Sequence, residues 1–225
     1  LYRVRIDEES GRLTHEPVLR GLEYRIAAAG YSTLDGYLYA LEAETLELLR
    51  IDAAGRITNL GYPNGLEPDM TYGAGTVSPD GRRFFVIGRD PDTGYDDILF
   101  SIAVGPTSRL TAGRVSVLSD FNVRTEDLAF DPVRGVLYGY DATTNKLVQF
   151  DQLAGLAVNY FSQSMSGVGV LGGLFFDQTG QLYGYGAPTR GGGGSDFFTI
   201  RKTNGVASPW QQGPGGGETD ACGCP

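Results

Sequence analysis

A glycine followed by a short aromatic and aliphatic run recurs four times along the chain. The runs are DGYLYAL from Asp35, DGRRFFVIG from Asp80, RGVLYGYD from Arg134 and TGQLYGYG from Thr179. Their anchoring glycines, Gly36, Gly81, Gly135 and Gly180, are separated by 45, 54 and 45 residues. Self-similarity at such a period indicates that one structural unit is repeated along the chain.

Three further short strands are predicted around each anchoring run. The strand before it reads EYRIAAAGYS, YGAGTVSPD, EDLAFDP or LGGLFFD, and the strand after it reads ELLRID, ILFSIAV, KLVQFD or DFFTIRK. A last strand closes each unit with RITNLGY, RVSVLSDF, AVNYFSQ or, least clearly, GVASPWQQ. Four short antiparallel strands in a period of about 40 to 50 residues are typical of a β-propeller blade.

The sequence therefore predicts an all-β fold, a β-propeller of four-stranded antiparallel blades. A lone four-stranded sheet cannot bury both of its faces, whereas sheets packed face to face around an axis can. We expect the propeller over residues 1–213, with complete blades over 22–62, 70–121, 124–165 and 168–213. Residues 214–225 are expected to form a Gly-rich, Cys-containing tail or linker.

The opening segment LYRVRID aligns with ELLRID, so that Ile6 and Asp7 match Ile51 and Asp52. This match predicts that it is the third strand of a blade, and that LTHEPVL (Leu13 to Leu19) is the fourth. Residues 1–20 would then encode only the outer half of a blade. The propeller is expected to have five blades, of which the first is half encoded here.

Three explanations account for the two inner strands that the first blade lacks. Residues upstream of Leu1 supply them, the tail patches the gap imperfectly, or another chain donates them. We favour the first explanation. An open sheet edge nevertheless invites strand addition, so a protein partner or self-assembly through the first blade is also expected.

Charge and hydropathy exclude two classes of partner. The formal net charge is -9, with a pI near 4.6. Nucleic-acid binding needs a basic surface, and anionic lipid attracts basic segments, so neither partner is expected. No apolar run approaches the roughly 18 to 20 residues that span a bilayer, which argues against membrane insertion.

Two cysteines, Cys222 and Cys224, lie in the terminal ACGCP. Residues two apart rarely form a relaxed disulfide with each other. A metal site needs about four ligands, and the only histidine is His15. We expect at least one cysteine to pair with a cysteine outside this segment, which predicts an extracellular or cell-surface location.

The segment RDPDTGYDD carries four closely spaced carboxylates, Asp90, Asp92, Asp96 and Asp97, around Gly94. Calcium prefers six to eight oxygen ligands of this kind. The segment resembles a DxDxDG loop, although Gly94 replaces the third ligand and no Glu follows at the twelfth position. Ca²⁺ is the only cofactor that the sequence suggests. The alternative is an acidic turn in which Asp and Gly serve turn geometry.

Acidic pairs also recur close to the predicted inner strands. They are Glu67 and Asp69, Glu126 and Asp127, and, in the tail, Glu218 and Asp220. If the blades are equivalent, these pairs lie at one mouth of the central channel, where they would bind a cation or raise each other's pKa. The alternative, which we favour, is that they cap exposed loop N–H groups.

Tyrosines alternate along three of the anchoring runs, as Tyr37 and Tyr39, Tyr138 and Tyr140, and Tyr183 and Tyr185. A tyrosine ladder can bind glycan by stacking, but inter-blade packing is the favoured interpretation. His15 stands alone in an outer strand and is expected at the surface. Because no triad, metalloprotease or phosphate-loop motif is present, no catalytic residue is predicted.

The segment LAFDPVRGVLYGYDATTNKLVQFD, from Leu128 to Asp151, resembles the repeats of NHL and gluconolactonase-like propellers. It is more similar still to propeller domains of large secreted bacterial surface proteins. That resemblance implies a domain that opens with a Cys-containing segment, where a partner for Cys222 or Cys224 would lie.

These observations predict a non-catalytic extracellular module that serves a structural, adhesive or interaction role in a cell-surface, matrix or filament assembly. One alternative is a propeller that binds carbohydrate or another ligand. The other is a metal-dependent enzyme of the lactonase or lyase kind that uses the acidic ring.

Overall fold

The computed structural model describes residues 1–7, 9–105, 110–118, 122–150, 158–165, 167–188, 195–214 and 222–223. Within these ranges the regular structure is entirely β-strand. No helix of the described chain is long and apolar enough to cross a bilayer. The all-β structure follows from the repeated runs of aromatic and aliphatic residues between glycine turns, because such residues suit a pleated strand packed on both faces.

Four antiparallel sheets of four strands each form complete blades. Blade 1 contains β3 (Ile26–Ser32), β4 (Tyr37–Glu42), β5 (Leu48–Ile51) and β6 (Ile57–Gly61). Blade 2 contains β7 (Thr71–Val77), β8 (Arg83–Arg89), β9 (Asp96–Ala103) and β10 (Ala112–Val117). Blade 3 contains β11 (Thr125–Phe130), β12 (Leu137–Asp141), β13 (Lys146–Phe150) and β14 (Val158–Ser164), and blade 4 contains β15 (Val168–Phe176), β16 (Leu182–Pro188), β17 (Asp196–Ile200) and β18 (Ala207–Gln212).

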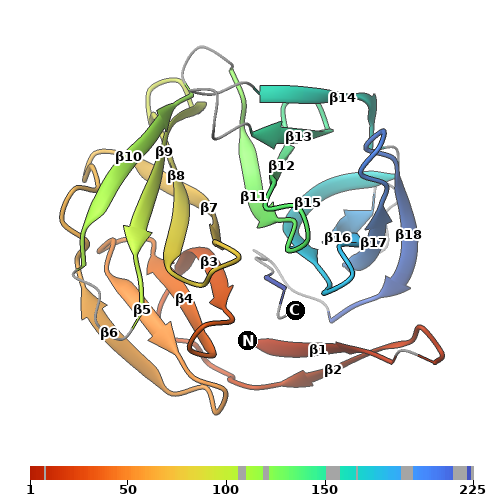
Figure 1. The fold of residues 1–225 in the computed structure, drawn as a ribbon, viewed down its shortest axis with the longest axis horizontal. Helices are drawn as coiled ribbons and strands as arrows, with labels where there is room; N and C mark the ends of the chain where they lie inside the picture. Colours follow the sequence, from red (N-terminus) through yellow and green to blue (C-terminus); the bar gives the residue numbers. More distant parts are fainter. Residues whose placement is uncertain are drawn as a thin grey trace.

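The blades stand in a ring around a central axis (Figure 1). Their first strands are innermost, with β3 beside β7, β7 beside β11 and β11 beside β15. In the described chain no comparable contact joins β15 to β3. The hairpin of β1 (Tyr2–Ile6) and β2 (Leu13–Pro17) lies there, in the fifth position of the ring, as a sheet of only two strands (Figure 1). The predicted β-propeller fold is confirmed.

A separate apolar cluster fills each interface between complete blades. Tyr39 and Leu48 meet Phe84 and Phe100 between blades 1 and 2, and Ile87 meets Leu137 and Phe150 between blades 2 and 3. Tyr140 and Leu147 meet Leu174 and Phe198 between blades 3 and 4. All of these side chains are buried, and burying an aliphatic or aromatic side chain contributes about 1.5–3 kcal/mol.

The four anchoring glycines all lie in turns between the first and second strands of a blade. Their φ angles are 74° at Gly36, 71° at Gly81, 67° at Gly135 and 81° at Gly180. This left-handed conformation is costly for a residue with a Cβ, which explains why glycine recurs there. The turn of blade 2 also contacts the turn of blade 1, because Ser32 Oγ donates a hydrogen bond of 3.0 Å to the Gly81 carbonyl.

Two of these glycines provide a matched test of inter-blade packing. A Cβ at Gly81 would lie 2.5 Å from Leu34 Cβ, whereas a Cβ at Gly135 would have no neighbour within 4 Å. Both substitutions to alanine incur the left-handed strain of about 1 kcal/mol, and overpacking adds about 1–3 kcal/mol at Gly81 alone. Chemical unfolding should therefore show a larger loss of stability for Gly81→Ala than for Gly135→Ala. Equal losses would show that the two turns do not press on each other.

Candidate functional site

The edge of β1 that faces the centre of the ring is open. The N–H of Asp7 bonds to the carbonyl of Arg12, and the N–H of Val18 bonds to the carbonyl of Leu1. Hydrogen-bonded pairs alternate along an antiparallel ladder, so Leu1, Arg3, Arg5 and Asp7 face β2. The N–H and C=O groups of Tyr2, Val4 and Ile6 therefore point the other way, where no described strand pairs with them. We call these groups the open edge.

One face of the hairpin packs on blade 4. Leu13 is buried against Tyr185 and Phe197, and Val4 and Ile6 add partly buried surface. The side-chain amide of Gln211 accepts a bond of 2.8 Å from the Leu13 N–H and donates one of 3.1 Å to the Leu13 carbonyl. These contacts hold the hairpin at the outer part of blade 4, and among the described strands none pairs with the open edge.

The other face of the hairpin is polar and meets blade 1 only at its outer rim. Arg3 Nη2 donates a bond of 3.0 Å to the Ala53 carbonyl, and Glu16 lies 3.4 Å from Arg3 and 3.5 Å from Arg5. Blade 1 nevertheless presents an apolar cluster on this side. Its buried members are Ala29, Ala40 and Leu49, with Tyr24, Ile26, Leu38 and Ile57 partly buried. No hairpin residue belongs to the cluster, which makes this interface unlike the other four.

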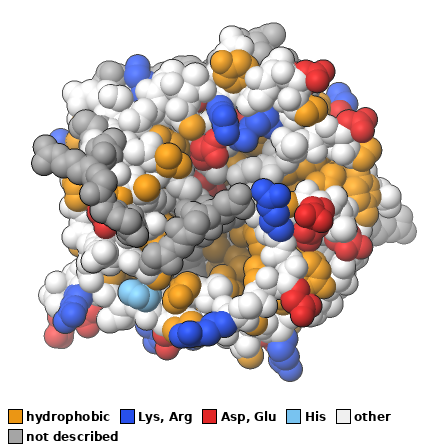
Figure 2. Space-filling view, turned by 180° about the vertical axis from the view of Figure 1, so that it is seen from behind, with side chains coloured by type: hydrophobic (Ala, Val, Ile, Leu, Met, Phe, Trp, Pro, Cys, Tyr) orange, Lys and Arg blue, Asp and Glu red, His pale blue; other side chains and the backbone are white. Residues whose placement is uncertain are grey.

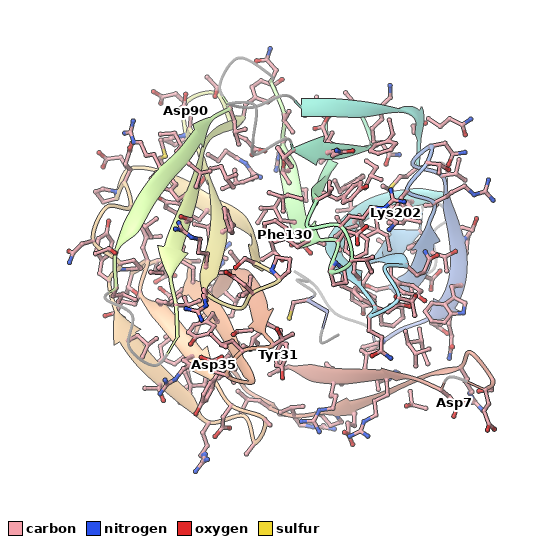
Figure 3. All side chains as sticks on the ribbon, in the orientation of Figure 1. Asp7, Tyr31, Asp35, Asp90, Phe130 and Lys202 are labelled. Carbon is pink, nitrogen blue, oxygen red and sulfur yellow. The ribbon has the colours of Figure 1, made fainter. Side chains whose placement is uncertain are left out.

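The central channel ends in a small cavity of about 100 Å³ where the inner strands finish. Tyr31 and Phe130 line it and lie near the centre of the ring (Figure 3). Cys222 and Gly223 also line it, and Gly223 presses on the Phe176 carbonyl so closely that a Cβ would not fit. Seen from behind, the middle of the molecule is hollowed and hydrophobic side chains lie along the hollow (Figure 2).

Cys222 is half-buried at this cavity, and Cys224 lies outside the described residues. The predicted pairing with a cysteine elsewhere therefore stays a prediction. Glu218 and Asp220 also lie outside the described residues, so the tail's acidic pair stays a prediction as well.

Asp96 does not project from a loop as a calcium ligand would. It begins β9 and is fully buried against the start of β11, where its Oδ2 accepts a bond of 2.7 Å from the Thr125 N–H. Arg89 lies across the hairpin from Asp96, at 3.4 Å, and donates a bond of 2.8 Å to the Thr125 carbonyl. Burial raises the pKa of Asp96 to about 6, against the lowering effect of Thr125 and Arg89. Asp96 and Arg89 thus clamp both backbone groups of Thr125 and join blade 2 to blade 3.

The remaining members of the predicted calcium loop form an acidic turn. Asp90 accepts a bond of 2.8 Å from the Asp92 N–H and one of 3.2 Å from Thr93 Oγ1. Asp90 lies on the outer part of blade 2, away from the centre (Figure 3), and Asp92 is exposed. The side chain of Asp97 is outside the description. Among the described residues, no three His, Cys, Asp or Glu side chains gather as a metal site would require.

Asp127 lies inside a blade interface, which corrects its expected place in an acidic ring. It is fully buried, and its two oxygens accept bonds from the N–H groups of Leu128 and, in the neighbouring inner strand, Leu174. Glu126 is the extra residue of a β-bulge, between Thr125 and Asp127. The bulge aims Glu126 away from the ladder, where it pairs with Arg124 at 2.8 Å.

The other predicted acidic pair is also divided. Glu67 forms an ion pair with Arg114 of β10, and Asp69 is exposed. Glu67, Glu126 and Asp127 are therefore bonded to basic side chains or backbone N–H groups, and no three acidic side chains of the described chain gather at one point.

The tyrosine ladder serves packing. Five of its six members, Tyr39, Tyr138, Tyr140, Tyr183 and Tyr185, are buried, and the sixth, Tyr37, is half-buried with the Arg50 guanidinium over its ring. The hydroxyls of Tyr39, Tyr140, Tyr183 and Tyr185 donate hydrogen bonds to polar partners, at 2.6 Å from Tyr39 to Asp35 and at 2.9 Å from Tyr140 to Asn145. Buried rings cannot stack on a glycan, so this observation favours the packing interpretation. His15 is exposed on β2, as predicted.

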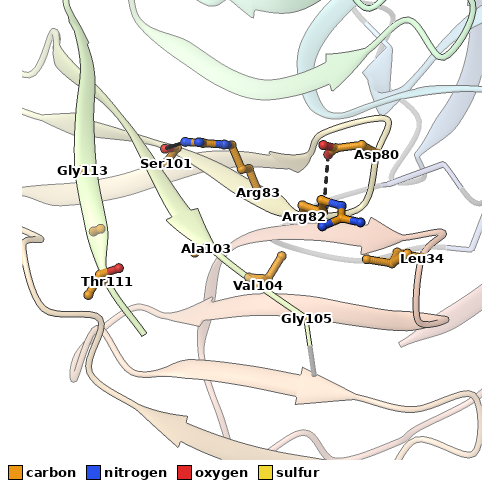
Figure 4. Close-up of a pocket in the computed structure, with 11 residues that line it drawn as sticks. Leu34, Asp80, Arg82, Arg83, Ser101, Ala103, Val104, Gly105, Thr111 and Gly113 are labelled. Carbon is orange, nitrogen blue, oxygen red and sulfur yellow. Dashed lines mark hydrogen bonds between the residues drawn. The ribbon is translucent and has the colours of Figure 1, made fainter. Parts of the chain in front are cut away.

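A cavity of about 610 Å³ lies at the outer part of blade 2, beside the blade 1 turn that contains Leu34 (Figure 4). Two arginines, Arg82 and Arg83, line it together with Asp80 and Ser101. Arg83 Nη1 donates to Ser101 Oγ at 3.2 Å, and Asp80 accepts from the Arg82 N–H at 3.1 Å and from Ser78 Oγ at 2.5 Å. The two guanidinium groups outnumber the one carboxylate. Sequence reasoning missed this site, because its walls come from separate strands and turns.

The buried Asp96 predicts a specific pH dependence. Its pKa is higher in the folded protein than the unfolded value near 4, so the folded state holds an extra proton between about pH 4 and 6. This contribution to stability falls as the pH rises through that window. Asparagine does not ionise, so the Asp96→Asn variant should not lose this stability. Its unfolding free energy, relative to that of the wild type, should therefore rise by about 2 kcal/mol as the pH is raised from 4.5 to 7.5. Urea unfolding of both proteins at several pH values measures this difference in unfolding free energy. A difference that stays constant with pH would contradict the raised pKa of a buried Asp96.

Comparison with solved structures shows that the fold is shared with proteins of several kinds. Catalytically inactive virginiamycin B lyase from Staphylococcus aureus is 15% identical, with a TM-score of 0.54, and the match covers 91% of this chain and 61% of the lyase. A chain of the nidogen/laminin complex is 15% identical, with a TM-score of 0.56 and coverage of 91% and 75%. The PQQ-bound aldose sugar dehydrogenase from Streptomyces coelicolor is 14% identical, with a TM-score of 0.52 and coverage of 94% and 72%.

This chain thus spans only about three fifths of the length of the lyase, and identities this low show the fold alone. A search of curated protein sequences finds no match. A family described as "Repeat of unknown function (DUF6923)" matches residues 1–225, the whole chain. The chain therefore belongs to this family of repeats, and its fold is a β-propeller.

Proposed function

We propose that this propeller is a non-catalytic interaction domain of an extracellular structural or adhesive assembly, and that it binds another polypeptide along the open edge of β1. One observation carries the proposal. Every other interface in the ring has an apolar cluster with residues from both sides, whereas the cluster of Ala29, Ala40 and Leu49 has members from blade 1 alone.

Strand addition suits this place for two physical reasons. An exposed row of N–H and C=O groups pairs readily with an extended chain. Each backbone hydrogen bond formed in this way makes a net contribution of about 0.5–1.5 kcal/mol to the binding free energy. The half-buried side chains of Ile26 and Leu38 on blade 1 would also gain burial from an incoming strand. Main-chain bonds would then provide affinity, and the flanking apolar faces would select the partner.

The polar residues support a non-catalytic role. Asp96, Asp127 and Arg89, which lie close to the inner strands, make bonds between blades and are not grouped around an accessible space. The cysteines of the tail and the resemblance to secreted surface proteins support an extracellular location. The likeness to a chain of the nidogen/laminin complex shows that this fold also occurs in a protein–protein complex.

Two proline substitutions test whether the open edge mediates association. The Val4 N–H belongs to the open edge, whereas His15, its partner in the ladder, has its N–H on the outer edge of β2. Proline removes that donor and leaves the bonds between β1 and β2 intact in both variants. Native mass spectrometry over a range of concentrations should show edge-to-edge association for the wild type and for His15→Pro, and its loss for Val4→Pro. A monomer at every concentration, or equal association of all three proteins, would refute the proposal.

The cavity beside Arg82 and Arg83 supports a second function, binding of a small carboxylate ligand. Its volume falls within the range of small-molecule sites, and guanidinium groups bind carboxylates through paired hydrogen bonds. The Arg82 guanidinium has no ion-pair partner within 4 Å among the described residues, so it is available to a ligand. In a chain of net charge -9, such a site is unlike the rest of the surface.

Calorimetric titration with citrate tests this second function. The double variant Arg82→Gln, Arg83→Gln should bind citrate at least about tenfold more weakly than the wild type, because it lacks both charged donors. Arg56→Gln is the control, since Arg56 pairs with Asp52 at 2.6 Å on another part of the surface. Undetectable binding to the wild type, or equal weakening by the control, would exclude the site.

A further inference from the structure

Two Asn-Gly pairs occur in the chain, at Asn64–Gly65 and at Asn204–Gly205. Such a pair is chemically labile, because the glycine nitrogen attacks the side-chain amide carbon of the asparagine and no Cβ on the glycine hinders the approach. The attack closes a five-membered succinimide ring and releases ammonia. Its rate in a folded protein depends on how firmly the structure holds the two reacting groups, and the two pairs differ in this respect.

The second pair is held in the tight turn between β17 and β18. The Gly205 N–H donates a hydrogen bond of 2.8 Å to the Arg201 carbonyl, and the side-chain Oδ1 of Asn204 accepts one of 3.2 Å from the Val206 N–H. Gly205 is also buried. Ring closure at Asn204 must break both hydrogen bonds, which adds about 1–3 kcal/mol to its barrier if each contributes about 0.5–1.5 kcal/mol.

The first pair lies in the connection between blades 1 and 2 and is accessible. Asn64 and Gly65 are the central residues of a turn in which the Leu66 N–H donates a hydrogen bond of 3.3 Å to the Pro63 carbonyl. Both central residues are exposed. In the part of the chain that the structure describes, neither the Asn64 side-chain amide nor the Gly65 N–H has a hydrogen-bond partner. Ring closure at Asn64 therefore breaks no hydrogen bond of the reacting groups among these residues.

The backbone of Asn64 fastens this connection to the outer strand of blade 2. The Asn64 N–H donates a hydrogen bond of 3.1 Å to the Leu110 carbonyl, and the Asn64 carbonyl accepts one of 2.7 Å from the Ala112 N–H at the start of β10. The turn fits closely against β10, because a Cβ at Gly65 would collide with the Ala112 carbonyl oxygen. An additional backbone atom in the turn would not fit there.

We infer that Asn64 is a site of spontaneous covalent modification, at which conversion to isoaspartate detaches the connection between blades 1 and 2 from β10. A C–N bond forms between the Gly65 nitrogen and Asn64 Cγ while the Cγ–Nδ2 bond breaks, and the Gly65 amide proton leaves with the Nδ2 group as ammonia. Water then opens the ring. Attack of water at Cγ gives aspartate, whereas attack at the main-chain carbonyl carbon gives isoaspartate, in which the chain runs through Cγ and is one carbon longer.

Peptide mapping by mass spectrometry, after the whole chain has been aged at mildly alkaline pH, follows both sites in one sample. The mass change of an NH₂ group replaced by OH marks conversion. Asn64 should convert at least about fivefold faster than Asn204, because hydrogen bonds that contribute about 1 kcal/mol or more oppose only the second reaction. Equal rates, faster conversion at Asn204, or no conversion at Asn64 would overturn the inference.

Amide hydrogen exchange on the aged protein tests the structural consequence. The Ala112 N–H should lose protection in the converted fraction. Asn64→Gln should keep this protection on ageing, because glutamine would have to close a less favourable six-membered ring. Freshly prepared Asn64→Asp adds the negative charge without lengthening the backbone, so it should protect Ala112 as the fresh wild type does. Conversion to isoaspartate without loss of protection at Ala112, or equal loss in fresh Asn64→Asp, would contradict detachment by a longer backbone.

Discussion

Face-to-face packing of blades is the constraint on which the whole structure depends. Each blade is a four-stranded sheet with an apolar face on both sides, so it is stable only between two neighbours. Tyr39 and Phe100, for example, are buried between blades 1 and 2, and Tyr140 and Phe198 between blades 3 and 4. A closed ring gives every blade two neighbours, but both faces of every blade are covered only if each position of the ring holds a full blade. In the part of the chain that the structure describes, the fifth position holds two strands, and no residue of this hairpin joins the apolar cluster on the adjacent face of blade 1.

Polar bonds near the ends of the inner strands tie neighbouring blades together. Ser32 bonds to the turn of blade 2, and Asp96 with Arg89 clamps Thr125 of blade 3. Between blades 3 and 4, Lys202 Nζ donates a bond of 2.6 Å to the buried carboxylate of Asp131. Buried carboxylates of this kind need partners, because an unpaired charge in a protein interior is strongly destabilising. Their recurrence therefore reflects the repeat architecture, in which each one joins two neighbouring blades.

The strand pattern could be read from the sequence because it depends on local features. The glycines at turns and the alternation of apolar residues located all of the strands, and the match of Ile6 with Ile51 placed β1 beside β2 as an outer pair. The positions of Asp96 and Asp127 depend on which blades are neighbours, and the sequence shows this only indirectly. One signal for the place of Asp96 was available. Arg89 and Asp96 flank a single hairpin loop, so they face each other across the hairpin with opposite charges. The cavity at Arg82 and Arg83 had no comparable signal.

The central claim, that no strand of the described chain pairs with the edge of β1 that faces the centre of the ring, is tested most directly by amide hydrogen exchange on the isolated protein. The N–H groups of Val4 and Ile6 should exchange rapidly, whereas those of Arg3 and Arg5, which bond to β2, should be protected. This two-residue alternation is specific to a strand paired on one side. Equal protection at Arg3, Val4, Arg5 and Ile6 would contradict the account, because it would show that the edge is already occupied.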